Sequence, residues 1–340
     1  MTNESIRAGL LGLGAMGVRH ARVLGGLEGI EFVGAADPLG NPADCPRGVP
    51  LLPSLDALLE LDIQMCVVAI PTEEHEKAGL RLADAGVATL IEKPLAVTWD
   101  EGLNLVNAFE AAGVVAATGL VERFNPALMN LKHRLGEGEL GEIYQIATSR
   151  QGPLPDNVPS VGVVKDLATH DLDLTQWVVE SEYQTLSAHT GSRSGRDRED
   201  FVAAVGRLDC GVIVNHLVNW MTPQKERRVV VNGERGVLAA DLLTADLALY
   251  AHGYATMWDE LATFRGAREG EIKRYALEKH EPLWMELCAF RDAVLGLPSE
   301  IASLSEGLNA IKLTDALLHS ANTRTTVEVS GQEPAGECRQ

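Results

Sequence analysis

The stretch IRAGLLGLGAMGVRHARVL, residues 6–24, decides the fold of the first part of the chain. Its first six residues predict a buried strand, and the apolar spacing from Ala15 onward predicts a helix. Gly12, Gly14 and Gly17 stand where the two elements meet. The first glycine allows a tight turn, the second lets a phosphate approach the backbone, and the third lets the helix pack closely on the strand. A strand, this glycine turn and a helix in that order predict a dinucleotide-binding α/β domain.

The same alternation of strands and helices continues to about residue 122. Strands are predicted at Ile6–Leu11, Glu31–Ala36, Met65–Ile70, Val87–Ile91 and Val114–Thr118, and helices at Ala15–Leu24, Leu55–Leu61, Glu73–Ala85 and Trp99–Ala112. Thr98 and Glu101 have the spacing of a capping box, and Gly113 is a helix terminator. The alternation predicts a doubly wound parallel sheet covered on both faces, a Rossmann domain over residues 1–122.

The pattern changes after Val121, where strands begin to follow one another directly. Asn125-Pro126 is typical of a helix start. Strands are then predicted at Ile143–Arg150, Thr185–Thr190, Phe201–Leu208, Val212–Trp220, Arg228–Asn232, Val237–Ala240 and Leu247–Tyr250, and helices at Glu281–Leu295 and Ser305–Ala321. Turns at Asp209–Gly211 and Asn232-Gly233 favour antiparallel pairing. We predict an α+β domain on an open, mostly antiparallel sheet over residues 123–329, and a disordered tail at 330–340.

Composition narrows the partners. The 48 acidic and 29 basic residues leave a net charge of −19, which argues against nucleic acid and against an anionic membrane surface. No apolar run reaches about 18 residues, and the N-terminus lacks a basic, then apolar, leader. The five cysteines are scattered without CxxC spacing, which favours reduced thiols over a disulfide framework or a zinc knuckle. We expect a cytoplasmic protein with a small-molecule partner.

An acidic residue follows the glycine turn at the distance that a dinucleotide requires. Asp37 ends the second predicted strand, 20 residues beyond Gly17, where a carboxylate accepts hydrogen bonds from an adenosine ribose. Pro38-Leu39 follow, with no adjacent arginine to pair with a 2′-phosphate. NAD is therefore predicted in preference to NADP.

Further candidate residues lie at the ends of two more strands. Pro71 and Thr72 follow the predicted strand Met65–Ile70, and Glu92-Lys93-Pro94 follow the next predicted strand. Ligands of open α/β sheets bind at the carboxyl ends of the strands, so these residues are predicted beside a cofactor.

The stretch KDLATHDLDLTQW, residues 165–177, holds three acids and a histidine in a helical pattern. Asp166 and His170 are four residues apart and share one face of a helix, with Asp173 near it. A solvated face is disfavoured by the surrounding leucines and Trp177. A metal site on these three residues is disfavoured because no second His or Cys cluster completes it, and we predict no metal. A proton-transfer pair remains the preferred interpretation, whereas structural roles for Asp171 and Asp173 stay open.

These motifs, taken together, resemble the Gfo/Idh/MocA oxidoreductases. The resemblance rests on Gly12-Leu13-Gly14-Ala15-Met16-Gly17, on Glu92-Lys93-Pro94, on Asp166-x-x-x-His170 and on the closing segment from Glu281. It implies a Rossmann domain followed by an open-faced sheet for substrate binding and oligomerisation. It also implies NAD- or NADP-dependent oxidation or reduction of a secondary hydroxyl on a sugar, a sugar derivative or a cyclic polyol such as inositol.

The resemblance implies a role for each matching residue. Lys93 binds and polarises the reacting hydroxyl, His170 transfers its proton, Asp166 binds substrate and partners the histidine, and Arg123 binds substrate. Ala168 stands where the family usually has a glycine. The cofactor-binding residues implied are Gly12, Gly14, Ala15, Met16, Gly17, Asp37, Pro71, Thr72, His75 and Glu92.

Three further expectations complete the sequence analysis. The short sequences ERFNP, GPLP and HDLD are similar to those of a branch of the family that includes nucleotide-sugar 3-dehydrogenases. A non-catalytic cofactor- or sugar-sensing regulator on the same fold is the alternative, which the presence of both Lys93 and His170 disfavours. The outer face of the second sheet predicts a homodimer or homotetramer assembled through the C-terminal domain.

Overall fold

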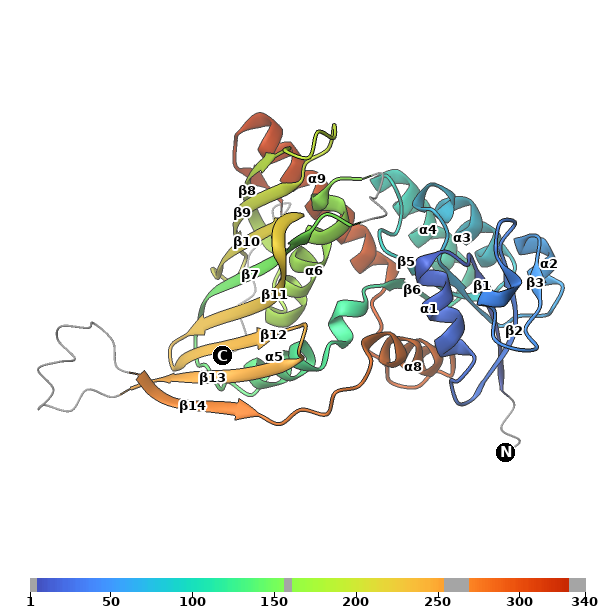
Figure 1. Cartoon of the computed structure of the whole chain (residues 1–340), viewed down its shortest axis with the longest axis horizontal. Helices are drawn as coiled ribbons and strands as arrows, with labels where there is room; N and C mark the ends of the chain where they lie inside the picture. Colours follow the sequence, from blue (N-terminus) through green and yellow to red (C-terminus); the bar gives the residue numbers. More distant parts are fainter. Residues whose placement is uncertain (1–4, 156–160, 254–268, 330–340) are drawn as a thin grey trace, which may run out of the picture. The chain divides into compact units, whose positions relative to one another are not determined.

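The computed structural model describes residues 5–155, 161–253 and 269–329 (Figure 1). The chain divides into two compact units, each described by itself below. The first unit consists of residues 1–121 and 281–312, and the second of residues 122–280 and 313–340.

The first unit is built on a parallel sheet, which confirms the predicted fold class. Its order in the described residues is β3-β2-β1-β4-β5-β6, and every pairing is parallel. The strands are β1 Ile6–Leu11, β2 Ile30–Ala36, β3 Leu51–Leu52, β4 Met65–Val68, β5 Ala88–Glu92 and β6 Ala116–Gly119. The order reverses between β1 and β4, which is the switch point where such sheets bind ligands.

Helices cover both faces of this sheet, as strand alternation requires. On one face Leu10 and Val67 pack with α1 and α8, and on the other Cys66 and Val68 pack with α3 and α4. The helices are α1 Ala15–Leu24, α2 Leu55–Leu59, α3 His75–Asp84, α4 Trp99–Ala112, α8 Pro282–Val294 and the first part of α9 Leu304–Thr323. The capping box of Thr98 and Glu101 is present, and Gly113 takes a left-handed conformation at the end of α4.

Residues 281–312 group with the first unit, whereas the sequence prediction assigned them to the second domain. Leu287 and Phe290 of α8 belong to the core of the face that α1 covers. Leu308 and Ile311 of α9 belong to the core of the opposite face. The chain therefore returns to complete both cores of the first sheet, a long-range packing relation that local sequence patterns do not carry.

The second unit is a mixed, mostly antiparallel sheet covered on one face. Its described strands have the order β14-β13-β12-β11-β7-β10-β9-β8-β15, in which only the β7–β10 pair is parallel. The strands are β7 Ile143–Pro153, β8 Tyr183–Gly191, β9 Phe201–Leu208, β10 Ile213–Asn219, β11 Met221–Gly233, β12 Gly236–Asp241, β13 Asp246–His252, β14 Glu269–Tyr275 and β15 Val327–Glu328. The covering helices are α5 Pro126–Gly136, α6 Thr169–Val179 and the remainder of α9.

Several element bounds differ from the prediction. β11 begins seven residues before the predicted Arg228, and its hairpin turn lies at Glu234-Arg235 because Gly233 still pairs with Gly236. β3, β14 and β15 were not predicted, since β3 and β15 are very short and β14, EGEIKRY, is rich in charged residues. The predicted disordered tail at 330–340 lies outside the described residues.

Three cysteines in the described residues are free thiols, Cys45, Cys66 and Cys288.

Within the described residues, no helix is both long enough and apolar enough to span a membrane.

Candidate active site

The glycine turn has the geometry that its sequence predicts. Gly12 has φ of +97°, and a side chain there would meet the carbonyl oxygen of Ala69 at 2.3 Å. A side chain at Gly17 would meet the carbonyl oxygen of Gly12 at 2.1 Å, so both positions require glycine. Gly14 differs, because a Cβ there would meet no atom within 4 Å, and no side chain caps α1. The first turn of α1, with Ala15 and Met16, therefore exposes backbone N–H groups to open space, which fits a pyrophosphate.

Asp37 is held beside this turn. Its two carboxylate oxygens accept the backbone N–H groups of Leu13, at 2.7 Å, and of Leu39, at 2.8 Å. Each oxygen retains a second lone pair for a further donor such as a ribose hydroxyl. The carboxylate of Asp37 is thus fixed beside the glycine turn and can still accept hydrogen bonds from a ligand.

The turn after β4 is tied to the turn after β5 by a buried histidine. Pro71 and Thr72 begin a short 3₁₀ turn that leads into α3. Nε2 of His75 lies 3.0 Å from the carbonyl oxygen of Ile70, and Nδ1 lies 3.1 Å from that of Pro94. Burial lowers the pKa of His75. Its ring is directed into the protein interior, where it supports both turns.

The segment Glu92-Lys93-Pro94 leaves the carboxyl end of β5 with a cis peptide bond between Lys93 and Pro94. Oε2 of the buried Glu92 accepts the backbone N–H of Lys93 at 3.1 Å. Oε1 lies 2.8 Å from Nε2 of His20, which is fully buried on α1. The lysine turn is therefore anchored from beneath by a carboxylate and a histidine.

The stretch 165–177 does not form the uniform α-helix that was predicted. Val164–Ala168 form a π-helical turn, and α6 begins only at Thr169, whose hydroxyl donates to the carbonyl oxygen of Lys165 at 2.8 Å. Asp166 stands on the wide turn, half-buried, and His170 stands in the first turn of α6, buried. Wide turns of this kind are frequent at functional sites because they redirect side chains out of the regular helix surface.

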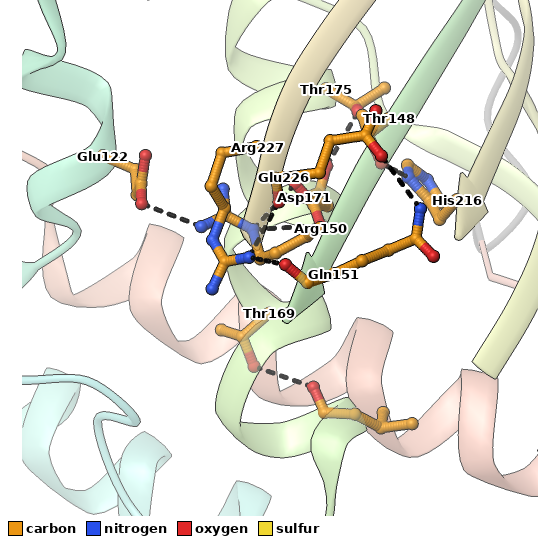
Figure 2. Close-up of polar contacts among 11 residues, drawn as sticks. Glu122, Thr148, Arg150, Gln151, Thr169, Asp171, Thr175, His216, Glu226 and Arg227 are labelled. Carbon is orange, nitrogen blue, oxygen red and sulfur yellow. Dashed lines mark hydrogen bonds and ion pairs between the residues drawn. The ribbon is translucent and has the colours of Figure 1, made fainter. Parts of the chain in front are cut away.

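An arginine that the sequence analysis did not select organises the surroundings of His170. Nε of Arg150, on β7, donates to both oxygens of Asp171 at 3.1 Å, and Nη1 donates to Glu122 at 2.8 Å (Figure 2). Burial favours the neutral form of Glu122, but the charges of Arg150 and His170 outweigh it and lower the pKa of Glu122 to about 2. Glu122 is thus an ionised carboxylate close enough to His170 for the two charges to interact.

Arg227 of β11 lies directly opposite Arg150 in the sheet register. It donates to the backbone carbonyl oxygens of Gln151, at 2.7 Å, and Glu226, at 2.8 Å. Burial and then the charge of Arg150 lower the pKa of Arg227, while the carboxylates around it, Asp166 included, oppose that shift. Burial raises the pKa of Asp171 to about 6 against the charge of Arg150. Arg150 lies between Ser149 and Gln151, and Arg227 lies between Glu226 and Arg228, so both are in polar stretches that no sequence motif marked.

Arg123 is engaged with the acid whose role was left open. Its Nε and Nη2 donate to the two oxygens of Asp173 at 2.9 and 2.5 Å, and its guanidinium lies 5.9 Å from the ring of Trp177. Asp173 and Asp171 thus both pair with arginines. Across the described ranges, no three His, Cys, Asp or Glu side chains converge as a metal site would require.

His216, on β10, belongs to the core of the second unit. Its ring nitrogens lie 2.7 Å from the hydroxyl of Thr148 and 2.8 Å from that of Tyr183. Burial lowers the pKa of His216 to about 4.

Comparison with known families decides the identity. Residues 6–120 match the family model described as "Oxidoreductase family, NAD-binding Rossmann fold", and residues 128–239 match the "GFO/IDH/MocA C-terminal domain". The chain belongs to the Gfo/Idh/MocA oxidoreductase family. The first unit of this oxidoreductase is therefore an NAD-binding Rossmann domain.

Relatives of this family member are named as sugar and polyol dehydrogenases. The chain is 26% identical to "Inositol 2-dehydrogenase 2" of Saccharopolyspora erythraea, with 96% of each chain covered. It is 26% identical to "UDP-N-acetylglucosamine 3-dehydrogenase" of Acidithiobacillus ferrooxidans, over 84% of this chain and 93% of that one. A solved structure of the latter enzyme has a TM-score of 0.82, at 22% identity, over 94% of this chain and 98% of the other. This last similarity concerns the fold.

Proposed function

We propose that the protein is a cytoplasmic NAD-dependent dehydrogenase that acts on a secondary hydroxyl, with Lys93, Asp166 and His170 as its catalytic residues. His170 is the proton-transfer residue, Lys93 stabilises the developing alkoxide, and Asp166 binds substrate and partners the histidine. Arg123 supports this site through Asp173.

The charges around His170 carry the proposal. Glu122 is held ionised by Arg150, and its carboxylate interacts with His170. A negative charge beside an imidazole stabilises the imidazolium that forms when the histidine takes a proton. His170 is therefore equipped to accept the hydroxyl proton of a substrate.

The chain's own residues account for the proton and for the charge on oxygen. As the C–H hydride leaves the carbinol carbon, the O–H proton passes to His170, and the O–H electron pair forms the new carbonyl. An ammonium such as that of Lys93 stabilises the oxygen while negative charge develops on it. NAD, when bound, supplies the hydride acceptor. The open space at Gly14 and the carboxylate of Asp37 fit the pyrophosphate and the adenosine ribose of that cofactor.

The substrate class follows from the relatives. The names inositol 2-dehydrogenase and UDP-N-acetylglucosamine 3-dehydrogenase both describe oxidation of a ring hydroxyl. We therefore propose a sugar, a sugar derivative such as a nucleotide sugar, or a cyclic polyol such as inositol as the substrate.

A turnover assay tests this function. Purified protein with NAD and a panel of inositols, aldoses and nucleotide sugars is expected to produce NADH with at least one substrate, measured by absorbance. NADP in place of NAD is expected to give a lower kcat/KM, because the Asp37 carboxylate repels a 2′-phosphate. Tight binding of NAD and of a sugar without any turnover across the panel would favour the alternative, a sensing regulator on the same fold.

Assembly through the second unit is part of the proposal. Val205 of β9 and Ile213 and Leu217 of β10 are exposed on the sheet face that the helices leave uncovered. An open sheet face that carries exposed apolar side chains is commonly covered by a second copy in a symmetric oligomer. Light scattering is expected to give a dimer or tetramer, and Leu217→Lys to reduce the mass toward 36.5 kDa. Leu39→Lys, at an exposed apolar residue of the first unit, is the matched control.

A further inference from the structure

Three buried polar side chains meet one face of the first sheet. His20 is on α1, Glu92 is at the end of β5, and Glu286 is on α8. Along β5 the side chains of Ala88 and Leu90 face the core that α1 and α8 cover, and alternation places Glu92 on the same side. The three residues therefore come from neighbouring elements that share one core.

The helices bring Glu286 toward His20. The buried residues of α8 are Leu283, Glu286, Leu287 and Phe290, which form one helical face. α8 packs against α1, whose buried residues include His20, Ala21 and Leu24 (Figure 1). Both His20 and Glu286 are fully buried. An acid with no exposed surface thus stands within an otherwise apolar helix contact.

The three side chains differ in how many of their polar atoms have a hydrogen-bond partner. Glu92 has two partners, Nε2 of His20 at 2.8 Å and the backbone N–H of Lys93 at 3.1 Å. Neither oxygen of Glu286 has a hydrogen-bond partner among the described residues, and the same holds for Nδ1 of His20. Both oxygens of Glu286 and Nδ1 of His20 thus remain without a partner in the core that they share.

Of the two buried acids, Glu92 and Glu286, we infer that Glu286 is the one that is protonated. Two carboxylates close together in an apolar interior cannot both be ionised without compensating charge. Burial first, and then the charge of Glu92, raises the pKa of Glu286 well above its ordinary value of 4.5. Glu92 already accepts two hydrogen bonds and so retains the negative charge. A protonated Glu286 has an O–H to donate, and the unpartnered Nδ1 of His20 is an acceptor when Nε2–H donates to Glu92.

We propose that Glu286, His20 and Glu92 form one buried hydrogen-bonded relay, in which a neutral Glu286 carboxyl donates through an ordered water to Nδ1 of His20, and Nε2–H of His20 fixes the carboxylate of Glu92 beneath the turn of Lys93. Glu286 is a positioning residue in this arrangement, acting through His20 and Glu92. Gly119 of β6 leaves the required room, because a Cβ there would approach Oε2 of Glu92 to 3.3 Å.

The relay links the last part of the chain to the proposed catalytic lysine. Glu92 orients the backbone N–H of Lys93, and His20 allows Glu92 only one orientation. Loss of the donor on Glu286 frees His20 to change tautomer or rotate, and the lysine turn loses its fixed support. This consequence rests on the proposed function, whereas the relay itself does not.

Spectroscopy of the full-length protein without ligands tests the relay directly. The infrared spectrum at pH 7 is expected to contain a carboxylic acid C=O band that disappears in Glu286→Gln. Nitrogen-15 NMR of the histidines is expected to show His20 with a protonated Nε2 and an unprotonated Nδ1. No acid band lost on substitution, or a proton on Nδ1 with Nε2 bare, overturns the proposal whether or not a substrate is known.

Kinetics test the positioning role. Glu286→Met matches the side chain in length but has no donor, and it is expected to lower kcat about tenfold, the equivalent of one lost hydrogen bond. Glu286→Gln keeps a donor and is expected to restore most of that loss. Leu287→Met, on the same buried face, is the control and is expected to retain the original kcat. Equal kcat for Glu286→Met and the control, with both folded by circular dichroism, overturns the positioning role. If no variant and no unmutated protein turns over, the proposed function fails while the spectroscopic result stands.

Discussion

The two units of this protein bury acidic side chains in opposite ways. In the second unit, Asp171 and Glu122 are compensated by Arg150, and Asp173 is compensated by Arg123. In the first unit, Glu92 and Glu286 share a core with the imidazole of His20.

The difference teaches that the partner decides the protonation state of a buried acid. A guanidinium keeps its charge at every relevant pH, and Arg150 holds Glu122 ionised beside His170, although burial still raises the pKa of Asp171 to about 6. A single imidazole cannot compensate two carboxylates, so one of them keeps its proton and becomes a donor. The arginine-rich cluster suits proton transfer, and the histidine–acid cluster suits fixed support.

The largest effect on activity is expected for substitution of His170, the proposed proton-transfer residue beside Glu122. His170→Ala removes the proposed base, and kcat is expected to fall by about 10²–10⁴-fold, the usual contribution of general-base catalysis. The affinity for NAD, measured by fluorescence titration, is expected to change little. Near-normal turnover in this variant would rule out the role of His170.

Substitution of Arg150 removes the positive charge that compensates two buried carboxylates in the second unit. Arg150→Met leaves Asp171 and Glu122 without their partner, and stability in urea denaturation is expected to fall by about 3–5 kcal/mol. Arg81→Met, which breaks the exposed pair with Asp56, is the control and is expected to cost at most about 1 kcal/mol. Similar costs for the two variants would show that burial of the Arg150 cluster contributes nothing.

The ionised carboxylate of Glu122 is expected to contribute stability that is lost at low pH. The pKa of Glu122 is about 2 in the folded protein, below its ordinary value of 4.5. Its contribution is therefore present above pH 4.5 and is lost as the pH falls toward 2. Glu122→Gln is expected to be about 1–3 kcal/mol less stable at pH 6, and this deficit is expected to shrink on acidification in urea titrations at fixed pH.

The protonated carboxyl of Glu286, in the first unit, is expected to make stability change with pH in the opposite direction. The unfolded chain ionises Glu286 above pH 4.5, whereas the folded protein keeps the carboxyl neutral, so the unmutated protein loses stability as the pH rises. Glu286→Gln removes this loss. Its advantage is expected to grow with pH above 4.5, by at most about 1.4 kcal/mol per pH unit, in the same urea experiment. A constant difference across this range contradicts a neutral Glu286.

The smallest effect concerns an acid that belongs to neither cluster. Asp37 lies beside the glycine turn, held by two backbone N–H groups. Asp37→Ser removes the charge that repels a 2′-phosphate, and the preference for NAD over NADP in kcat/KM is expected to narrow by about tenfold. A better kcat/KM with NADP in the unmutated protein contradicts the cofactor assignment.

Local patterns in the sequence were sufficient for much of the first unit. β1 and α1 have the predicted bounds, and Thr98 caps α4 as its spacing with Glu101 indicates. The steric requirement for Gly12 and Gly17 was also predictable, because a glycine turn and the strand and helix beside it are contiguous in the chain. For the proposed site, the sequence was sufficient to select His170, Asp166 and Lys93 as candidates, though not to test them.

Only the tertiary structure determined what surrounds these candidates. The return of α8 to the first unit, the wide turn at Asp166 and the register that sets Arg227 opposite Arg150 depend on residues far apart in sequence. Glu286 shows why: its helical pattern is that of an ordinary amphipathic helix, and its acid is on the buried face only because α8 packs on α1. Propensity, caps and turns act over a few residues and are therefore readable in one stretch. The charge state of a buried group depends on every neighbour that folding brings to it, and those neighbours are fixed only when the chain is packed.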